Sequence, residues 1–228
     1  MVSLDEVRQM LDVSPLCINS KNSIKSGKLS TTDGRSINFD IYVEWNLKIA
    51  RMCETHWGDF NIRLLEFIRQ AIDNGADRNT LLSQTQFGDA HWEWLKKALA
   101  FQDERYRWFT IFAEDVPQAV CVIFQPKASV ISPDSNIFYI EYLATAPWNR
   151  NNLMGPKKLG GMGTLIIETA CEYAINQLGL RPGFSLHSLP GAIDFYRKIG
   201  MSQFPQHDKD SLVFFEIFGD LNHLGRIS

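Results

Sequence analysis

The stretch "KLGGMG" (158–163) leads directly into the apolar run "TLIIETACEYA" (164–174). It holds three glycines in four positions. Glycine inside a regular element costs roughly 0.5–1 kcal/mol relative to alanine, so this cluster needs a reason. One interpretation is a plain turn. The other is a ligand that approaches bare backbone at a helix N-terminus, where unpaired N–H groups and the helix dipole favour an anion.

Two known phosphate-binding motifs do not fit these glycines. A Walker A loop requires lysine directly after its last glycine, whereas Gly161 follows Gly160. A dinucleotide-binding fingerprint requires a further glycine three residues after Gly163, where Ile166 stands. The remaining pattern is K-x-x-G-x-G, placed between an expected strand and an expected helix.

The rest of the chain changes character near residue 104. After it, β-branched and aromatic runs alternate with helical stripes, which predicts strands over 104–115, 118–126 and 136–146, a helix over 162–179, a strand over 183–189, a helix over 191–200 and a last strand over 211–218. Before it, the pattern predicts helices over 60–75 and 88–103, the second with Asp89 as N-cap. Residues 20–36 are turn-rich, and 37–45 is either a strand or the approach to a helix.

In this setting the sequence resembles the GNAT superfamily of acyl-CoA N-acyltransferases. The resemblance covers about residues 104–218 and rests on order: "IEYLATAP" (140–147), the glycine motif, and "GAIDFYRKIGM" (191–201) before a final strand. The family has arginine or glutamine where Lys158 stands, and often asparagine where Leu189 stands. The stretch 148–157 is longer than the common family pattern. There, Arg150 and Lys157 either reach the cofactor or are only solvated.

The resemblance implies an α+β fold with a mixed, mainly antiparallel sheet flanked by helices and an enlarged N-terminal helical segment. Residues 1–102 would form that segment and contribute to the acceptor side. Residues 103–228 would form the acyl-CoA-binding core, within one compact domain overall. The strands at 136–146 and 183–189 would separate after a few pairs to admit the coenzyme.

The resemblance also assigns the donor site, with acetyl-CoA as co-substrate. The backbone N–H groups from Leu159 through Gly160, Gly161, Met162 and Gly163 to Thr164 would hold the pyrophosphate, next to Lys158. Leu143, Ala144 and Thr145 would pair with the pantetheine arm, and Tyr196 would face the thioester sulfur.

Two side chains are candidates for acid–base chemistry. Tyr196 would protonate the leaving thiolate; alternatively it is a core residue, since Ala192, Phe195, Tyr196 and Ile199 form one helical stripe. Glu141 interrupts an apolar strand and would act as general base, directly or through water. The alternative is a half-exposed or ion-paired glutamate. His187 is more often structural than catalytic in such a strand, and Trp92 and Trp94 more often pack in a core than line a substrate pocket.

The resulting hypothesis is an N-acetyltransferase that moves an acetyl group from acetyl-CoA to a primary amine in a ternary complex. The alternatives are a non-catalytic acyl-CoA-binding sensor or scaffold, and a protein-directed acetyltransferase acting as toxin or regulator. The formal net charge of −3 speaks against general nucleic-acid binding. The apolar last strand could add to a second copy of the chain, which makes a homodimer possible.

The cysteine spacing and the hydropathy of the chain indicate in which compartment the protein is found and whether it binds a metal. Cys17, Cys53, Cys121 and Cys171 form no CxxC pair and have no histidine at metal-ligand spacing, so we expect no metal and reduced thiols. No apolar run approaches the roughly 20 residues of a membrane span. We therefore expect a cytoplasmic protein that does not insert into membranes.

Overall fold

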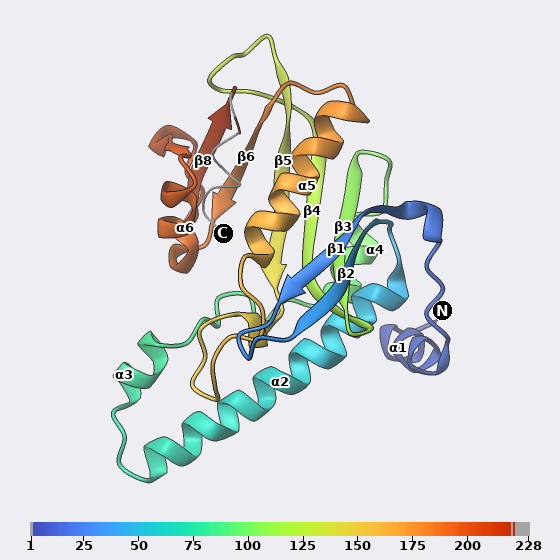
Figure 1. Ribbon diagram of the computed structural model, residues 1–228. Coiled ribbons are helices and arrows are strands. Elements are labelled where there is room, and N and C mark those ends of the chain that lie inside the picture. Colours follow the sequence, from blue (N-terminus) through green and yellow to red (C-terminus); the bar gives the residue numbers. More distant parts are fainter. Residues whose placement is uncertain (1, 220, 222–228) are drawn as a thin grey trace. The chain divides into compact units, whose positions relative to one another are not determined.

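The computed structural model describes residues 2–219 and 221 (Figure 1). Its α-helices are α1 (Leu4–Val13), α2 (Leu47–Asp73), α3 (Arg78–Ser83), α4 (Trp94–Ala100), α5 (Met162–Asn176) and α6 (Ile193–Lys198). Its strands are β1 (Ser23–Ser30), β2 (Ser36–Val43), β3 (Tyr106–Ala113), β4 (Val116–Ala128), β5 (Asn136–Thr145), β6 (Gly183–Ser188), β7 (Ser202–Gln203) and β8 (Val213–Phe218).

The strands form an eight-stranded sheet in the order β1-β2-β3-β4-β5-β6-β8-β7. β5 and β6 are parallel, whereas β1–β2, β6–β8 and β7–β8 are antiparallel. The expected α+β class with a mixed, mainly antiparallel sheet and flanking helices is confirmed. The last long strand, β8, which could have added to the sheet of a second copy, lies between β6 and β7, and β7 pairs with its residues 215–216.

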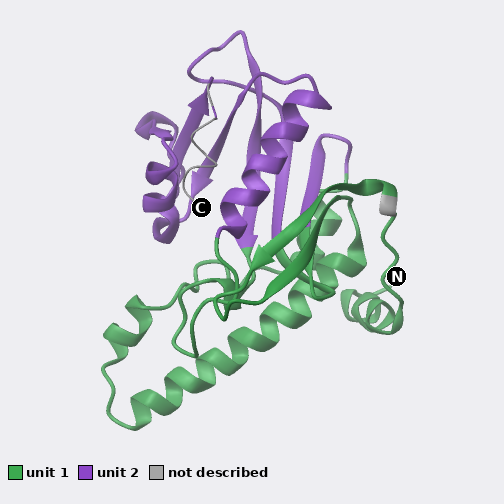
Figure 2. Cartoon of the chain, in the orientation of Figure 1, with its two compact units in different colours: residues 1–102, 111–118, 145–160 green, residues 103–110, 119–144, 161–228 purple. Residues whose placement is uncertain are grey.

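The chain divides into two compact units, coloured separately in Figure 2. The first unit contains residues 1–102, 111–118 and 145–160. The second unit contains residues 103–110, 119–144 and 161–228. No helix in the described part of the chain is both long enough and apolar enough to cross a membrane.

Helices α1, α2 and α4 pack together in the first unit. α1 begins with a reciprocal capping box between Ser3 and Glu6. α2 is much longer than the helix expected over 60–75, because Asn46 caps it through the N–H groups of Lys48 and Ile49. The helix expected from residue 88 was placed too early: α4 begins at Trp94, and Asp89 is not its N-cap.

Two hairpins also contribute to the first unit. β1 and β2 pair from Ser23 to Tyr42 and settle the open interpretation of 37–45 in favour of a strand. The turn between β3 and β4 has Glu114 and Asp115 at φ 52° and 60°. Two consecutive positive φ values are those of a type I′ hairpin turn.

The core of the second unit is aromatic. Phe138 of β5 and Phe184 of β6 stack with ring centroids 5.4 Å apart. α5 contacts the sheet through Tyr173 against Phe109 of β3, with centroids 5.4 Å apart. Gly200, at φ 83°, ends the α6 region as expected. Together these contacts fix β5, β6 and the helices on which the candidate site depends.

Candidate functional site

The parallel contact between β5 and β6 is short. Its register consists of Phe138–Phe184, Tyr139–Ser185 and Ile140–Leu186. β5 continues to Thr145 and β6 to Ser188 beyond the last of these pairs. The β5–β6 register therefore ends at Ile140–Leu186, after a few pairs, as the resemblance implied.

The glycine turn prepares the N-terminus of α5. Gly161 is the N-cap residue and lies in the left-handed region at φ 72°, with no side-chain cap. The N–H of Leu165 donates to the carbonyl of Gly161, so the N–H groups of Met162, Gly163 and Thr164 lie in the first turn and have no intrahelical acceptor. A Cβ added to Gly160 would meet no atom within 4 Å. This geometry suits an anion that approaches bare backbone.

The residues just before this turn are anchored within the first unit. The N–H of Leu159 donates to Oδ1 of Asn149 at 3.1 Å, and the N–H of Lys158 donates to the carbonyl of Trp148 at 3.0 Å. The Lys158 ammonium lies 5.9 Å from the Trp148 ring centre. Because the Leu159 N–H already has a partner, the donors left for a ligand begin at Gly160 rather than at Leu159.

The 148–157 stretch is packed into the first unit at its start, around Asn149 and Arg150, whereas residues 154–157 are exposed. Arg150 pairs with both carboxylate oxygens of Asp89, and the two side chains are only 13% and 12% exposed. Arg150 Nε also donates to the carbonyl of Thr145 at 2.8 Å. Arg150 is thus neither solvated nor free for the cofactor. Lys157 contributes its backbone carbonyl to Thr32 Oγ1 at 2.6 Å.

The three residues expected to pair with pantetheine differ in burial and in hydrogen bonding. Leu143 is half-buried, and Ala144 is buried. Thr145 already accepts from Arg150 through its carbonyl. A pantetheine arm could therefore use the Thr145 carbonyl only by displacing Arg150.

Tyr196 lies on α6 inside the aromatic core. Its ring centroid is 5.8 Å from that of Phe215 on β8 and 5.1 Å from that of Phe195. Burial raises the pKa of the Tyr196 phenol well above its ordinary value. Tyr196 is thus both a core residue and a phenol that stays protonated across the physiological range, which a proton donor requires.

Glu141 is the first β5 residue beyond the last β6 pair, and its side chain is half-buried. Burial raises the pKa of Tyr139, and the nearby Glu141 charge raises it further. The same two causes act, in the same order, on Tyr142 and Tyr106. Tyr139, Tyr142 and Tyr106 therefore all lie within electrostatic range of the Glu141 carboxylate.

His187 is not available as a base. Its Nε2 lies 2.8 Å from the carbonyl of His207, which can only accept, so Nε2 carries the proton. Its Nδ1 then accepts from the Tyr139 hydroxyl at 2.7 Å. Burial lowers the pKa of His187. Both ring nitrogens are engaged within the protein, which supports the structural interpretation of this residue.

The buried cysteines are poor nucleophiles. Cys53, Cys121 and Cys171 are buried and free, and burial raises the pKa of each thiol. A thiol acts as a nucleophile through its thiolate, which these environments disfavour. Across the described residues no group of three or more His, Cys, Asp or Glu side chains is placed to hold a metal ion.

Several residues that shape this region could not be identified from local sequence patterns. Asn149 and Gln118 bridge the 148–159 stretch to β4: Asn149 Nδ2 and Trp148 Nε1 both donate to Gln118 Oε1 at 2.9 Å. The Asp89–Arg150 pair joins positions 61 residues apart. Such contacts depend on the fold, because no local spacing encodes them.

The fold is similar to those of proteins of known structure. The crystal structure of the GNAT domain of S. lividans PAT matches with a TM-score of 0.52 and 11% identity, over 85% of this chain and 97% of that one. An uncharacterized protein from Bacillus halodurans matches with a TM-score of 0.50 and 8% identity, over 90% of this chain and 94% of that one. No protein-family model and no curated protein matches the sequence. The chain has the GNAT fold.

Proposed function

We propose that this chain is an N-acetyltransferase that transfers the acetyl group of acetyl-CoA to a primary amine by direct attack. One observation carries the proposal: β5 and β6 stop pairing after Ile140–Leu186, and β5 leads through one connection to the left-handed Gly161 that opens α5. An unpaired strand edge can pair with an extended, amide-containing arm. A helix N-terminus with bare glycines favours a pyrophosphate.

In this proposal the donor is held mainly by backbone. The N–H groups from Gly160 to Thr164 bind the pyrophosphate, and Leu143 and Ala144 pair with the pantetheine amides. Lys158 and Leu159 position the turn through their bonds to Trp148 and Asn149. The burial of Met162 and Thr164 leaves the backbone of this turn to meet the ligand.

The chemistry assigned to the side chains balances as follows. The neutral amine nitrogen attacks the thioester carbonyl, a C–N bond forms, and the C–S bond breaks. The nitrogen proton passes to Glu141, directly or through water, and the thiolate takes the proton of Tyr196. A protonated phenol supports this role, since burial keeps the Tyr196 pKa high. No covalent acyl-enzyme is needed, which accords with the high pKa values of the buried thiols.

A thiol-release assay tests the proposal directly. Acetyl-CoA is supplied with a panel of amines, amino acids, polyamines, aminoglycosides and lysine peptides, and coenzyme A affinity is measured in parallel by calorimetry. Acceptor-dependent release supports the enzyme. Tight coenzyme binding without release from any acceptor would replace it with the acyl-CoA-binding module, and no binding would overturn both.

Glu141→Gln tests the base. The acidic limb of the kcat/KM pH profile should disappear or move, because the group that must lose a proton is gone. An acidic limb identical to that of the unaltered protein would remove Glu141 from the mechanism.

In the thiol-release assay, release of coenzyme A with lysine peptides alone would favour the protein-directed alternative.

A further inference from the structure

The three residues before the glycine turn are held by hydrogen bonds on both sides. The carbonyl of Lys157, the N–H and carbonyl of Lys158, and the N–H of Leu159 are four consecutive backbone groups, and each has a partner in the first unit. The two N–H groups donate to residues 148–149, and the two carbonyls accept from Thr32. The chain therefore enters the turn with its backbone fixed from both sides.

Thr32 supplies both contacts to these carbonyls. Its Oγ1 donates to the carbonyl of Lys157 at 2.6 Å, and its N–H donates to the carbonyl of Lys158 at 3.1 Å. Its neighbour Thr31 forms an antiparallel β-bridge with Leu159. The bond between Thr32 and Lys157 joins positions 125 residues apart, so no local pattern in the sequence predicts it.

The turn between β1 and β2 (residues 31–35), to which Thr32 belongs, is closed by hydrogen bonds of its own. The N–H of Thr31 donates to the carbonyl of Arg35 at 2.8 Å, and Arg35 Nε donates to Asp33 at 2.9 Å. Hydrogen bonds from Thr31 and Arg35 lower the pKa of the Asp33 carboxyl to about 2. Asp33 is therefore ionised at neutral pH, and the turn presents Thr32 in one fixed arrangement.

A backbone anion site depends on where its N–H groups point before the ligand arrives. Glycine has the greatest backbone freedom of all residues, and ordering a backbone costs conformational entropy. A ligand binds more tightly when the fold has already ordered the segment that it meets. Hydrogen bonds that fix the peptides just before Gly160 are contacts of this kind.

We propose that Thr32 is a positioning residue for the pyrophosphate of the coenzyme. By holding the carbonyls of Lys157 and Lys158, it fixes the backbone that leads into Gly160, the first residue of the glycine turn. Gly160 and Thr32 belong to the same compact unit. Thr32 itself touches no ligand atom and acts through the backbone. This inference rests on the proposed function, and it gives the β1–β2 hairpin a part in donor binding.

Thr32→Val tests the hydroxyl contact. Valine has nearly the shape of threonine, the N–H bond to Lys158 remains, and the position is exposed, so the core is not disturbed. Calorimetry on the full chain should show that the affinities for coenzyme A and for inorganic pyrophosphate each fall about threefold to tenfold, the effect of one lost hydrogen bond. Thr32→Ser keeps the hydroxyl and should bind both probes within a factor of about two of the unaltered protein.

Ser26→Ala is the matched control within the same hairpin. Ser26 of β1 pairs with Asp40 of β2, and its hydroxyl donates to the Asp40 carboxylate. The substitution removes an exposed hydroxyl contact from the hairpin and leaves the turn as it is. It should keep the coenzyme affinity of the unaltered protein. Equal losses in Ser26→Ala and Thr32→Val would mean that hairpin stability alone matters, and would overturn the proposal.

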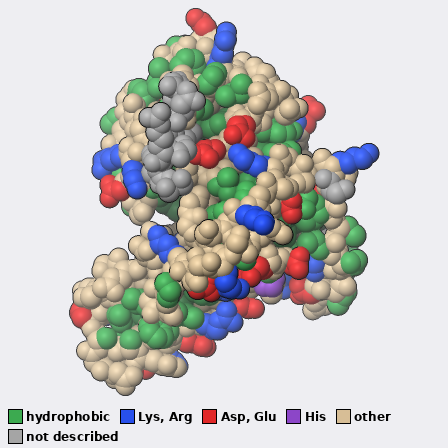
Figure 3. All heavy atoms as spheres, in the orientation of Figure 1, with side chains coloured by type: hydrophobic (Ala, Val, Ile, Leu, Met, Phe, Trp, Pro, Cys, Tyr) green, Lys and Arg blue, Asp and Glu red, His purple; other side chains and the backbone are tan. Residues whose placement is uncertain are grey.

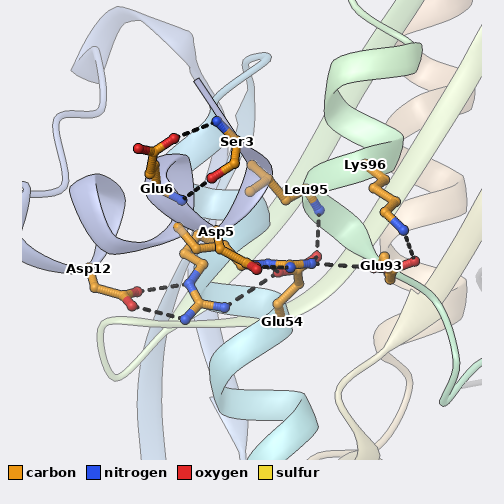
Figure 4. A network of polar contacts seen from close by, with 10 residues as sticks. Ser3, Asp5, Glu6, Asp12, Glu54, Glu93, Leu95 and Lys96 are labelled. Carbon is orange, nitrogen blue, oxygen red and sulfur yellow. Dashed lines mark hydrogen bonds and ion pairs between the residues drawn. The ribbon is translucent and has the colours of Figure 1, made fainter. Parts of the chain in front are cut away.

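A second polar network of the first unit provides a control for stability. Figure 4 shows this network, in which Glu54 is joined to Leu95 and to which Asp12 also belongs. Asp12 accepts from Arg51 at 2.8 and 2.9 Å. Asp12→Asn weakens that ion pair and should leave coenzyme affinity unchanged, whatever its melting temperature. Affinities that follow the melting temperature alone, across Asp12→Asn and Thr32→Val, would overturn the positioning role.

Turnover gives a readout that a purely structural role would not move. With an acceptor identified by thiol release, Thr32→Val should raise the KM for acetyl-CoA about threefold to tenfold and leave kcat within a factor of about two. Loss of binding that is common to the ground state and the transition state raises KM without lowering kcat. A lower kcat at an unchanged KM would contradict the proposal.

The binding data separate this inference from the proposed function. Coenzyme A bound equally by Thr32→Val and by the unaltered protein would reject the positioning role and keep the acetyltransferase. Pyrophosphate binding that weakens in Thr32→Val, without coenzyme A binding or thiol release, would keep Thr32 as the positioning residue of an anion site and reject the acetyltransferase. Binding of neither probe by the unaltered protein would overturn both.

Discussion

Ile140 of β5 and Leu186 of β6 form the last pair of a three-pair parallel contact, and Glu141 is the next residue along β5. The register between β5 and β6 ends at this pair. In the donor site that we propose, an extended arm with amide groups lies along β5 beyond this pair. The pair therefore marks where the β5–β6 pairing ends and the proposed donor site begins.

Gly161→Val should weaken coenzyme A binding at least tenfold. The left-handed φ of 72° disfavours any side chain by about 1–2 kcal/mol, and a branched side chain would also crowd the first-turn N–H groups. The measurement is a calorimetric titration with coenzyme A, combined with urea unfolding.

Gly179→Val provides the matched control for this variant. Gly179 follows the other end of α5 at φ 65°, and a Cβ there would meet no atom within 4 Å. It should lose comparable stability and keep its coenzyme affinity. Equal losses of affinity in both variants would mean that Gly161 acts through folding alone.

Tyr196→Phe should lower kcat by about 10²-fold or more, since a positioned general acid contributes roughly 10²–10⁴-fold. Coenzyme affinity should stay within a factor of about two, because the ring still packs on Phe215. Burial raises the Tyr196 pKa above the ordinary tyrosine value of about 10. Loss of the Tyr196 proton therefore cannot cause a fall in kcat on the alkaline side of the pH–rate profile below that pH.

Tyr173→Phe removes a hydroxyl from the same unit and serves as the comparison. Tyr173 lies on α5 and packs against Phe109. It should retain full turnover. A kcat as high in Tyr196→Phe as in Tyr173→Phe would leave Tyr196 as a core residue and nothing more.

The parts of the fold that sequence predicts best are those with local signals. Alternating β-branched residues indicated β3, β4 and β5, and the glycines at 161 and 200 fall where helices begin and end. The predicted start of α4 was wrong by several residues. Asp89 is a residue type that often caps helices, but its carboxylate is paired with Arg150 instead. Tertiary ion pairing overrode a local preference there.

In the candidate site, too, residues with a local sequence signal were predicted and residues joined only by the fold were not. Gly161 and Tyr196 were found through motif order, since their neighbours in sequence carry the pattern. The hydrogen bonds at the N–H of Leu159 and at the carbonyl of Thr145 could not be predicted, because Asn149 and Arg150 reach these groups only in the folded chain.

On the face shown in Figure 3, basic and acidic side chains are interspersed, in keeping with the small net charge of −3.

Glu216→Ala should lower the free energy of unfolding by about 3 kcal/mol or more. This fully buried carboxylate accepts from Ser129 Oγ at 2.6 Å and from the N–H groups of Val130 and Ile131 at 3.1 and 2.9 Å. Each donor left unsatisfied costs roughly 1–3 kcal/mol. Urea unfolding measures the change. The control is Glu104→Ala, at an exposed position in the same unit, whose free energy of unfolding should stay within about 0.5 kcal/mol of the unaltered protein. If Glu216→Ala loses no more than this control, the β4–β5 connection does not depend on the Glu216 carboxylate.

His187 should make stability fall as the pH drops below its ordinary pKa of about 6.5. Burial lowers its pKa in the folded chain, while Lys209 and Lys127 act in the same direction and the His207 carbonyl and Asp208 oppose them. The unfolded chain then takes up the proton first, unfolding is coupled to proton uptake, and the stability present above pH 6.5 is lost toward the lower folded value. In His187→Gln, whose amide can still accept from Tyr139 and donate to His207, the unfolding free energy between about pH 6.5 and 5 should depend less on pH than in the unaltered protein. His56→Gln, at an exposed position, should keep the original slope. Parallel slopes for all three proteins in urea titrations at each pH would mean that protonation of His187 does not oppose folding.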